Sequence, residues 1–240
     1  MKRLICLVLA LTMIFSLTAC GPSTPAEQPA SAEPAAAEQP AGPKILRVAN
    51  DLSSLGNLNL HLSTYNQCFE IGNTICETLI NKDPETLELY PLLLTKMPDI
   101  SEDGLTYTFE LKQGIKFHDG SPLTTEDVVY TFNKFFDPDA GCLTTWLATM
   151  IKGSNEYLER KEDHLTGIKA IDDYHFTLEL YYPYSAFTSV LAAAPLVIYP
   201  SDAAEAAGDR WGIDTFIGTG PFKVESFEPK TKVVLARFDE

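Results

Sequence analysis

The hydrophobic pattern is most regular between Tyr107 and Pro138, where a period of two gives way to a helical period. Apolar residues first alternate with polar ones, which predicts a strand, a turn at Gln113-Gly114 and a second strand. The alternating apolar positions are Tyr107, Phe109, Leu111, Ile115 and Phe117. A further turn is predicted at 119–122, where the sequence reads Asp-Gly-Ser-Pro.

A capped helix is predicted directly after this turn. Thr124 stands three residues before Asp127, so a hydroxyl and a carboxylate can bond to the free N–H groups of a helix start. Asp137-Pro138 ends the helix. The apolar residues on one helix face are Val128, Val129, Phe132, Phe135 and Phe136.

Weaker patterns predict further elements on both sides of this stretch. Before it, we expect a strand over 45–49, a helix over 67–81 capped by Asn66, a turn at 82–85 and a strand at 87–90. After it, we expect a helix over 142–152, a hairpin around Asp172-Asp173, a short helix from Phe187, a buried strand over 196–199, a helix over 202–207 capped by Ser201, and a final hairpin turning at 228–230.

The N-terminus has the pattern of a secretory signal over residues 1–19. Two basic residues precede an apolar run that is short for a membrane span. The ending Leu17-Thr-Ala-Cys20 resembles a bacterial lipoprotein box, which implies cleavage before Cys20 and lipidation of its sulfur. An ordinary secretory signal and a retained membrane helix are the alternatives. Residues 20–43 are rich in proline and have no aliphatic side chain larger than alanine beyond Cys20, so we expect an extended tether.

Composition and charge narrow the function classes. The chain has 33 acidic and 18 basic residues and a net charge of −15, which argues against nucleic acid and against direct adsorption to anionic lipid. Cys68, Cys76 and Cys142 lie beyond the signal and share no C-x-x-C motif, so we expect buried free thiols and leave a pairing of Cys142 open.

No catalytic or metal-binding constellation is found in the sequence, so we expect no enzyme, no cofactor and no metal site. The four histidines have no ligand spacing, and no nucleophile motif is present. His118-Asp119 lies on a predicted turn and is interpreted as a polar turn pair. Gly218-Thr-Gly220 is followed by proline and a strand, which does not suit a phosphate site.

Residues 109–132 read F-x-L-K-x-G-I-K-F-H-D-G-S-P-L-T-x-E-D-V-V-Y-T-F. This stretch resembles the signature region of the extracytoplasmic solute-binding proteins of peptide and nickel ABC importers, and Gly218-Thr-Gly-Pro-Phe222 resembles a second motif of that family. The resemblance implies an α/β fold of the periplasmic-binding-protein type (type II) with an extra α/β subdomain. It assigns 44–68 and 195–240 to lobe I and 69–194 to the subdomain. Family members are commonly much longer, so we expect a fragment or truncated product that lacks the second lobe and binds peptide weakly or not at all.

The same resemblance implies a function in transport. The expected ligand is a di- or oligopeptide, and the expected partners are ABC permease subunits and, through the lipid on Cys20, the cell membrane. Thr64, Tyr65 and Asn66 resemble a stretch that lines the ligand cleft, and Trp146 lies near an aromatic position that contacts ligand. Core packing for Trp146 and a surface turn for Tyr65 are the alternatives. A nickel-binding member and a surface lipoprotein with a sensory or interaction role are the alternative functions.

Overall fold

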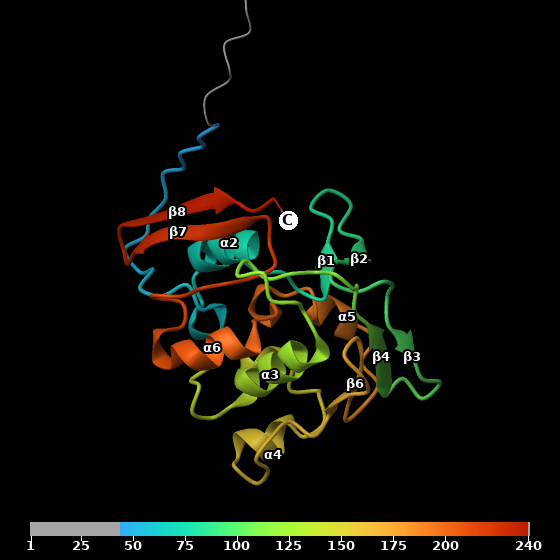
Figure 1. Cartoon of the computed structure of the whole chain (residues 1–240). Helices are drawn as coiled ribbons and strands as arrows, with labels where there is room; N and C mark the ends of the chain where they lie inside the picture. The colour runs from blue at the N-terminus through green and yellow to red at the C-terminus, as the bar shows by residue number, and fades with distance from the viewer. Residues whose placement is uncertain (1–43, 240) are drawn as a thin grey trace, which may run out of the picture. The chain divides into compact units, whose positions relative to one another are not determined.

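Figure 1 shows the computed structural model of the chain, in which residues 44–239 are described. The chain divides into two compact units, Met1–Arg47 and Val48–Glu240. The predicted signal peptide, Cys20 and the tether over 20–43 lie outside the described residues. Among residues 44–239, no helix has the length and apolar character needed to cross a bilayer.

The largest sheet of the second unit has four antiparallel strands in the order β3-β4-β6-β5. In that order the strands are β3 (Asp99–Ile100), β4 (Thr106–Glu110), β6 (His175–Glu179) and β5 (Ile168–Ala170). Phe109 on β4 lies opposite Phe176 on β6, and their rings stack with centroids 4.7 Å apart. The strands predicted around these two residues are therefore confirmed, and they are the central strands of the sheet.

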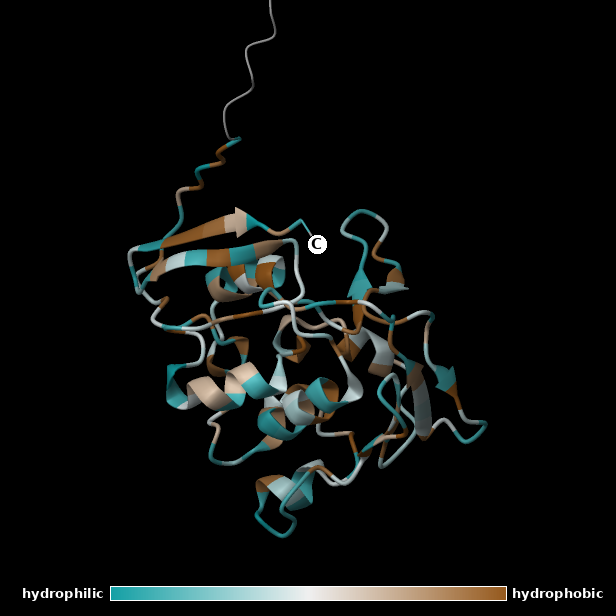
Figure 2. Cartoon of the chain, viewed as in Figure 1, coloured by the Kyte–Doolittle hydropathy of each residue, from teal (hydrophilic) through white to brown (hydrophobic). Residues whose placement is uncertain are grey.

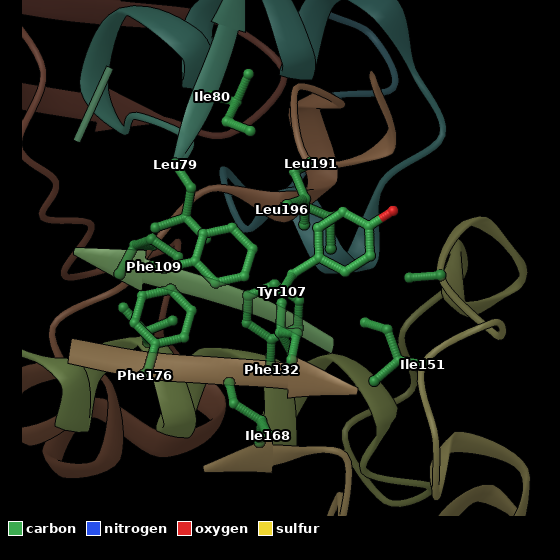
Figure 3. Close-up of a cluster of buried hydrophobic side chains, with 14 of the residues drawn as sticks. Leu79, Ile80, Tyr107, Phe109, Phe132, Ile151, Ile168, Phe176, Leu191 and Leu196 are labelled. Carbon is green, nitrogen blue, oxygen red and sulfur yellow. The ribbon is translucent and has the colours of Figure 1, made fainter. Parts of the chain in front are cut away.

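Helix α3 (Thr125–Phe136) buries the apolar face that the sequence predicts. Its fully buried apolar side chains, each at most 1% exposed, are Val128, Phe132, Phe135 and Phe136. They pack with residues of the four-stranded sheet in one hydrophobic core, which we call the α/β core (Figure 3). Two short helices, α4 (Ser154–Leu158) and α5 (Phe187–Val190), also contribute apolar side chains to it. The predicted α/β class is confirmed.

A second hydrophobic core is built around the ring of Tyr199, and we call it the aromatic core. This ring lies 4.9 Å from His61, 5.4 Å from Trp211 and 5.8 Å from Phe216, measured between centroids. Its other fully buried members are Leu55, Leu58, Leu60, Cys68, Ile75, Cys76, Val197 and Ala204.

Two helices and a hairpin surround the aromatic core. The helices are α2 (Asn66–Ile75) and α6 (Ser201–Ala207), and the hairpin pairs β7 (Phe222–Glu228) with β8 (Lys232–Arg237). Figure 1 shows the hairpin running across α2, and Figure 2 shows β8 as the more hydrophobic of its two strands. The hairpin and its turn at 228–230 are as predicted.

The segment 196–199 is shared by the two cores. Leu196 and Ile198 belong to the α/β core, whereas Val197 and Tyr199 belong to the aromatic core. The predicted burial is confirmed, but the segment forms only an isolated bridge between Val197 and Thr78 and no strand of a sheet. The side chains of this segment are buried in the two cores on either side of it. This burial, and not pairing in a sheet, keeps the segment extended.

Two predicted helices are wrong at their ends. The helix over 67–81 is α2, which stops at Ile75 because the Ile75 carbonyl accepts a bond from the Gly220 N–H, 2.9 Å away, and the chain then extends. It continues as β1 (Ile80–Lys82), which pairs with β2 (Leu89–Pro91). Asn66 and Ser201 begin their helices as first residues and are not the caps.

Three other predicted elements are absent. Residues 45–49 form no strand, and no described strand pairs with them. Ile115 and Phe117 flank only an isolated bridge from Lys116 to Pro122. The helix over 142–152 is reduced to the 3-10 helix η2 (Thr145–Leu147), because the backbone of Met150 and Lys152 bonds to Tyr181 and Glu179. The remaining 3-10 helices are η1 (Leu60–Leu62), η3 (Ala194–Leu196) and η4 (Gly208–Arg210).

The carboxylate of Asp127 bonds to the starts of two helices. Its Oδ2 accepts the Thr124 N–H at 2.9 Å, which closes the predicted capping box of α3. Its Oδ1 accepts the backbone N–H of Ser201 at 2.8 Å and the Ser201 hydroxyl at 2.9 Å, at the start of α6. Asp127 is only 6% exposed. One side chain therefore joins the α/β core to the aromatic core.

His61 is buried as a neutral ring between the two cores. Its centroid lies 5.3 Å from that of Phe135 and 4.9 Å from that of Tyr199, and the residue is 3% exposed. Burial lowers the pKa of His61 from 6.5 to about 3, against the opposing effect of a hydrogen bond with the Pro195 backbone. The unfolded chain therefore binds a proton here at a higher pH than the folded chain does.

The substitution Asp127→Asn should destabilise the fold by roughly 2–4 kcal/mol, because an amide nitrogen would face an N–H donor and the charge-assisted bonds would be lost. Urea unfolding measures this free energy. The matched control is Asp139→Asn, since Asp139 is exposed and pairs only with Arg160. An equal loss in both variants would contradict the assignment.

Acid should destabilise the chain through His61. Below an ordinary histidine pKa the unfolded state gains a proton that the folded state lacks, so stability falls by about 2 kcal/mol between about pH 6.5 and pH 5 from this group alone. Urea unfolding at several pH values measures it, and His61→Phe should remove that part of the dependence. A pH dependence that is identical in both proteins would show that His61 does not carry it.

Candidate functional site

The predicted residues Thr64, Tyr65 and Asn66 lie where η1 leads into α2. All three are exposed, and Tyr65 is 51% exposed. The Ser63 hydroxyl accepts the Tyr65 N–H at 3.1 Å, and Tyr65 is the N-cap residue of α2. The turn before the helix therefore holds the Tyr65 backbone, while its ring faces no hydrophobic core. Its alternative interpretation, a surface turn residue, remains open.

Trp146 lies in the middle of η2 and is 69% exposed. It is a member of neither hydrophobic core. The core-packing interpretation of Trp146 is therefore wrong for this structure. A single exposed apolar side chain is common on protein surfaces, so the exposure of Trp146 is informative only together with other exposed apolar residues near it.

The structure brings the segments of these two predicted sites together. The Leu143 N–H donates to the His61 carbonyl at 2.9 Å, so the chain before Trp146 runs beside the chain before Tyr65. Leu62 and Leu143, on the same two segments, are 40% and 54% exposed. We call Leu62, Tyr65, Leu143 and Trp146 the apolar face.

The apolar face is also free of charge. Residues 52–69 and 140–151, which carry it, contain no Asp, Glu, Lys or Arg, although acidic residues are frequent elsewhere in the chain. A molecule held there would meet apolar and aromatic side chains, hydroxyls, amides and backbone groups. Such a surface can bind an uncharged or extended chain, but it offers no ion pair from these two segments.

A separate pocket of about 720 Å³ has Glu77, Lys112 and Thr219 among its lining residues. The Glu77 carboxylate accepts the Thr219 hydroxyl at 2.8 Å, and Lys112 donates to the Leu92 carbonyl at 2.8 Å. Burial raises the pKa of Glu77, while Thr219 and Lys112 oppose this rise. None of the predicted site residues lines this pocket. Glu77 is not among the site residues predicted from the sequence. The signal that could have found it is its carboxylate, which is the only charged group in the run Ile75–Ile80.

Over residues 44–239 the thiols are free, as predicted for Cys68 and Cys76. Cys142, whose pairing was left open, is also unpaired. Burial raises the pKa of each of the three thiols, which keeps them protonated and unreactive. Among the described residues, no group of three or more His, Cys, Asp or Glu side chains is placed to hold a metal ion.

The chain is similar to known proteins over most of its described length. It is 31% identical over 179 residues to a dipeptide-binding protein of Lactococcus lactis, which covers 72% of this chain and 32% of that protein. It is 27% identical over 245 residues to the dipeptide-binding protein DppE of Bacillus subtilis, covering 99% of this chain and 43% of DppE. The chain thus spans less than half the length of these relatives.

The fold has solved counterparts. The substrate-binding domain of an oligopeptide ABC transporter from Bacillus anthracis matches with a TM-score of 0.74 and 22% identity, over 79% of this chain and 37% of that one. This likeness shows that the chain adopts part of the periplasmic-binding-protein fold.

A family model, described as the middle part of the bacterial extracellular solute-binding proteins of family 5, matches residues 88–240, more than half of the chain. This range includes α3, the four-stranded sheet and the Gly218–Gly220 segment. The chain belongs to the bacterial extracellular solute-binding proteins of family 5.

Proposed function

We propose that this chain is the ligand-binding part of an ABC importer that takes up di- and oligopeptides and delivers them to a membrane permease. Its membership of the solute-binding family and the names of its relatives, which are dipeptide-binding proteins, support this proposal. The observation that carries it is the Leu143–His61 bond, because it joins the exposed segments of Tyr65 and Trp146, neither of which contains a charged residue.

In this proposal the peptide lies against the apolar face. Backbone groups of 64–66 bond to the peptide main chain, and the rings of Tyr65 and Trp146 contact its side chains. Recognition of the main chain suits an importer that takes many sequences, since every peptide offers the same N–H and C=O groups. The predicted lobe I, at 44–68 and 195–240, and the predicted subdomain at 69–194 would then form one side of the ligand cleft, with the apolar face exposed on it.

A lipid on Cys20 would hold the protein outside the cytoplasm, on the membrane that carries its permease. The apolar run and the Leu-Thr-Ala-Cys sequence that ends at Cys20 support this part of the proposal. A tether over 20–43 would keep the binding region clear of the lipid headgroups. Peptide is proposed ahead of chelated nickel, because the relatives that match are named for peptides.

Trp146→Ala should weaken peptide binding about tenfold, or about 1.4 kcal/mol, because an exposed indole is a strong apolar anchor. Titration of the parent chain and the variant with a mixed dipeptide pool, followed by calorimetry, measures the weak binding that we expect of this chain. Fluorescence is not suitable, because the variant keeps only Trp211, which is 5% exposed.

The matched control for Trp146 is Ile171→Ala, which removes an apolar side chain that is 61% exposed on the β5–β6 turn. It should leave binding unchanged. If both variants bind like the parent chain, the apolar face is not the peptide site.

Lipidation is tested by mass spectrometry of the protein from a bacterial membrane fraction. We expect a mature N-terminus at Cys20 that carries a diacylglycerol group, and we expect Cys20→Ala to leave the membrane fraction. A mature chain with an unmodified Cys20 thiol would remove the anchor from the proposal.

A further inference from the structure

Three hydrogen bonds of His118 join the turn at 117–121 to the segment Gly218–Gly220. The His118 N–H donates to the Gly218 carbonyl at 3.0 Å. The Gly218 N–H donates to His118 Nδ1 at 3.3 Å, and His118 Nε2 lies 2.8 Å from the Gly220 carbonyl. His118 is therefore not a polar turn pair with Asp119, as the sequence suggested. The Asp119 carboxylate bonds instead to Ser121 within the turn.

These contacts specify one protonation state of the ring. Nδ1 faces an N–H donor and must accept, whereas Nε2 faces a carbonyl and must donate. The neutral imidazole with its proton on Nε2 meets both conditions. The imidazolium ion does not, because its Nδ1–H would point at the Gly218 N–H and leave that donor without an acceptor.

The segment that His118 contacts is itself held on the aromatic core. A Cβ at Gly218 would lie 2.1 Å from the Ile75 carbonyl oxygen, and a Cβ at Gly220 would lie 2.7 Å from that of Thr74. The two glycines therefore allow the segment to lie against the end of α2. Phe117, next to His118 in the chain, is buried in the α/β core. His118 thus links the turn of one core to a fixed segment of the other.

The charged groups around the ring act in both directions. Burial is the largest effect and lowers the pKa of His118, and Lys223 on β7 also lowers it. The hydrogen bond with Gly220 and the carboxylate of Asp119 raise this pKa. The Phe238 ring packs edge-on at 4.8 Å, and Glu77 lies behind the segment, bonded to Thr219.

We propose that His118 is a proton-sensitive contact between the two cores: the neutral ring holds the 117–121 turn against Gly218–Gly220, and protonation of Nδ1 releases it. The proton comes from solvent and the released Gly218 N–H turns to water, so no other reactant is needed. Acidification then weakens the contact of His118 with Gly218, whereas the bond from the Gly220 N–H to the Ile75 carbonyl stays intact. This contact does not depend on which ligand the protein binds.

NMR of the folded chain tests the proposal in two ways. At about pH 7.5 the nitrogen shifts of His118 should show a protonated Nε2 and an unprotonated Nδ1. As the pH falls below the lowered His118 pKa, hydrogen exchange at the Gly218 amide should speed up about tenfold more than at the Gly220 amide, after correction for intrinsic rates. An Nδ1–H tautomer, or equal changes at the two amides, would overturn it.

Variants separate this contact from the other histidines. His118→Gln keeps a side-chain N–H donor but does not titrate, so the difference between Gly218 and Gly220 should no longer depend on pH. His164→Gln is the control, because His164 is exposed and pairs with Asp163, and the difference should persist there. Protonation of His61 would affect both amides together. If His118→Gln does not fold, the tautomer and exchange data on the unaltered chain still decide the question.

Discussion

The buried carboxylate of Asp127 links the α/β core to the aromatic core. Asp127 accepts hydrogen bonds from the starts of α3 and α6, and these helices belong to different hydrophobic cores. A helix start has free N–H groups that must find acceptors when they are buried. Because one carboxylate serves both starts, neither helix can rotate without leaving the other uncapped, and the relative position of the cores is fixed.

The candidate site depends on this contact between the two cores. Tyr65 follows a segment that lines the aromatic core, whereas Trp146 precedes Ala148 and Met150 of the α/β core. The segments that precede them are joined by the bond from the Leu143 N–H to the carbonyl of His61, whose ring lies between Phe135 and Tyr199. The apolar face therefore straddles the boundary between the cores. Whether the boundary matches the predicted division into lobe I and subdomain stays a prediction.

Local signals predicted the fold where they agreed with long-range contacts. The strand at Phe109, the capping box at Thr124 and the amphipathic face of α3 needed only neighbours in sequence, and all are present. Prediction failed where distant parts of the chain form hydrogen bonds. The Ile75 carbonyl bonds to Gly220, and residues 150–152 bond to Glu179 at the end of β6 and to Tyr181 after it. Positions 64–66 and 146 came from resemblance, and nothing in their own pattern shows that their segments lie side by side. The links of Asp127 to Ser201 and of His118 to Gly218 span long separations and left no local signal.

The missing charge on the apolar face has a consequence for the medium in which the protein works. Dissolved ions weaken attraction between opposite charges over about 8 Å at physiological ionic strength, but they screen apolar contact and short backbone bonds far less. If the apolar face holds the ligand as proposed, binding there should change less with ionic strength than binding through ion pairs would.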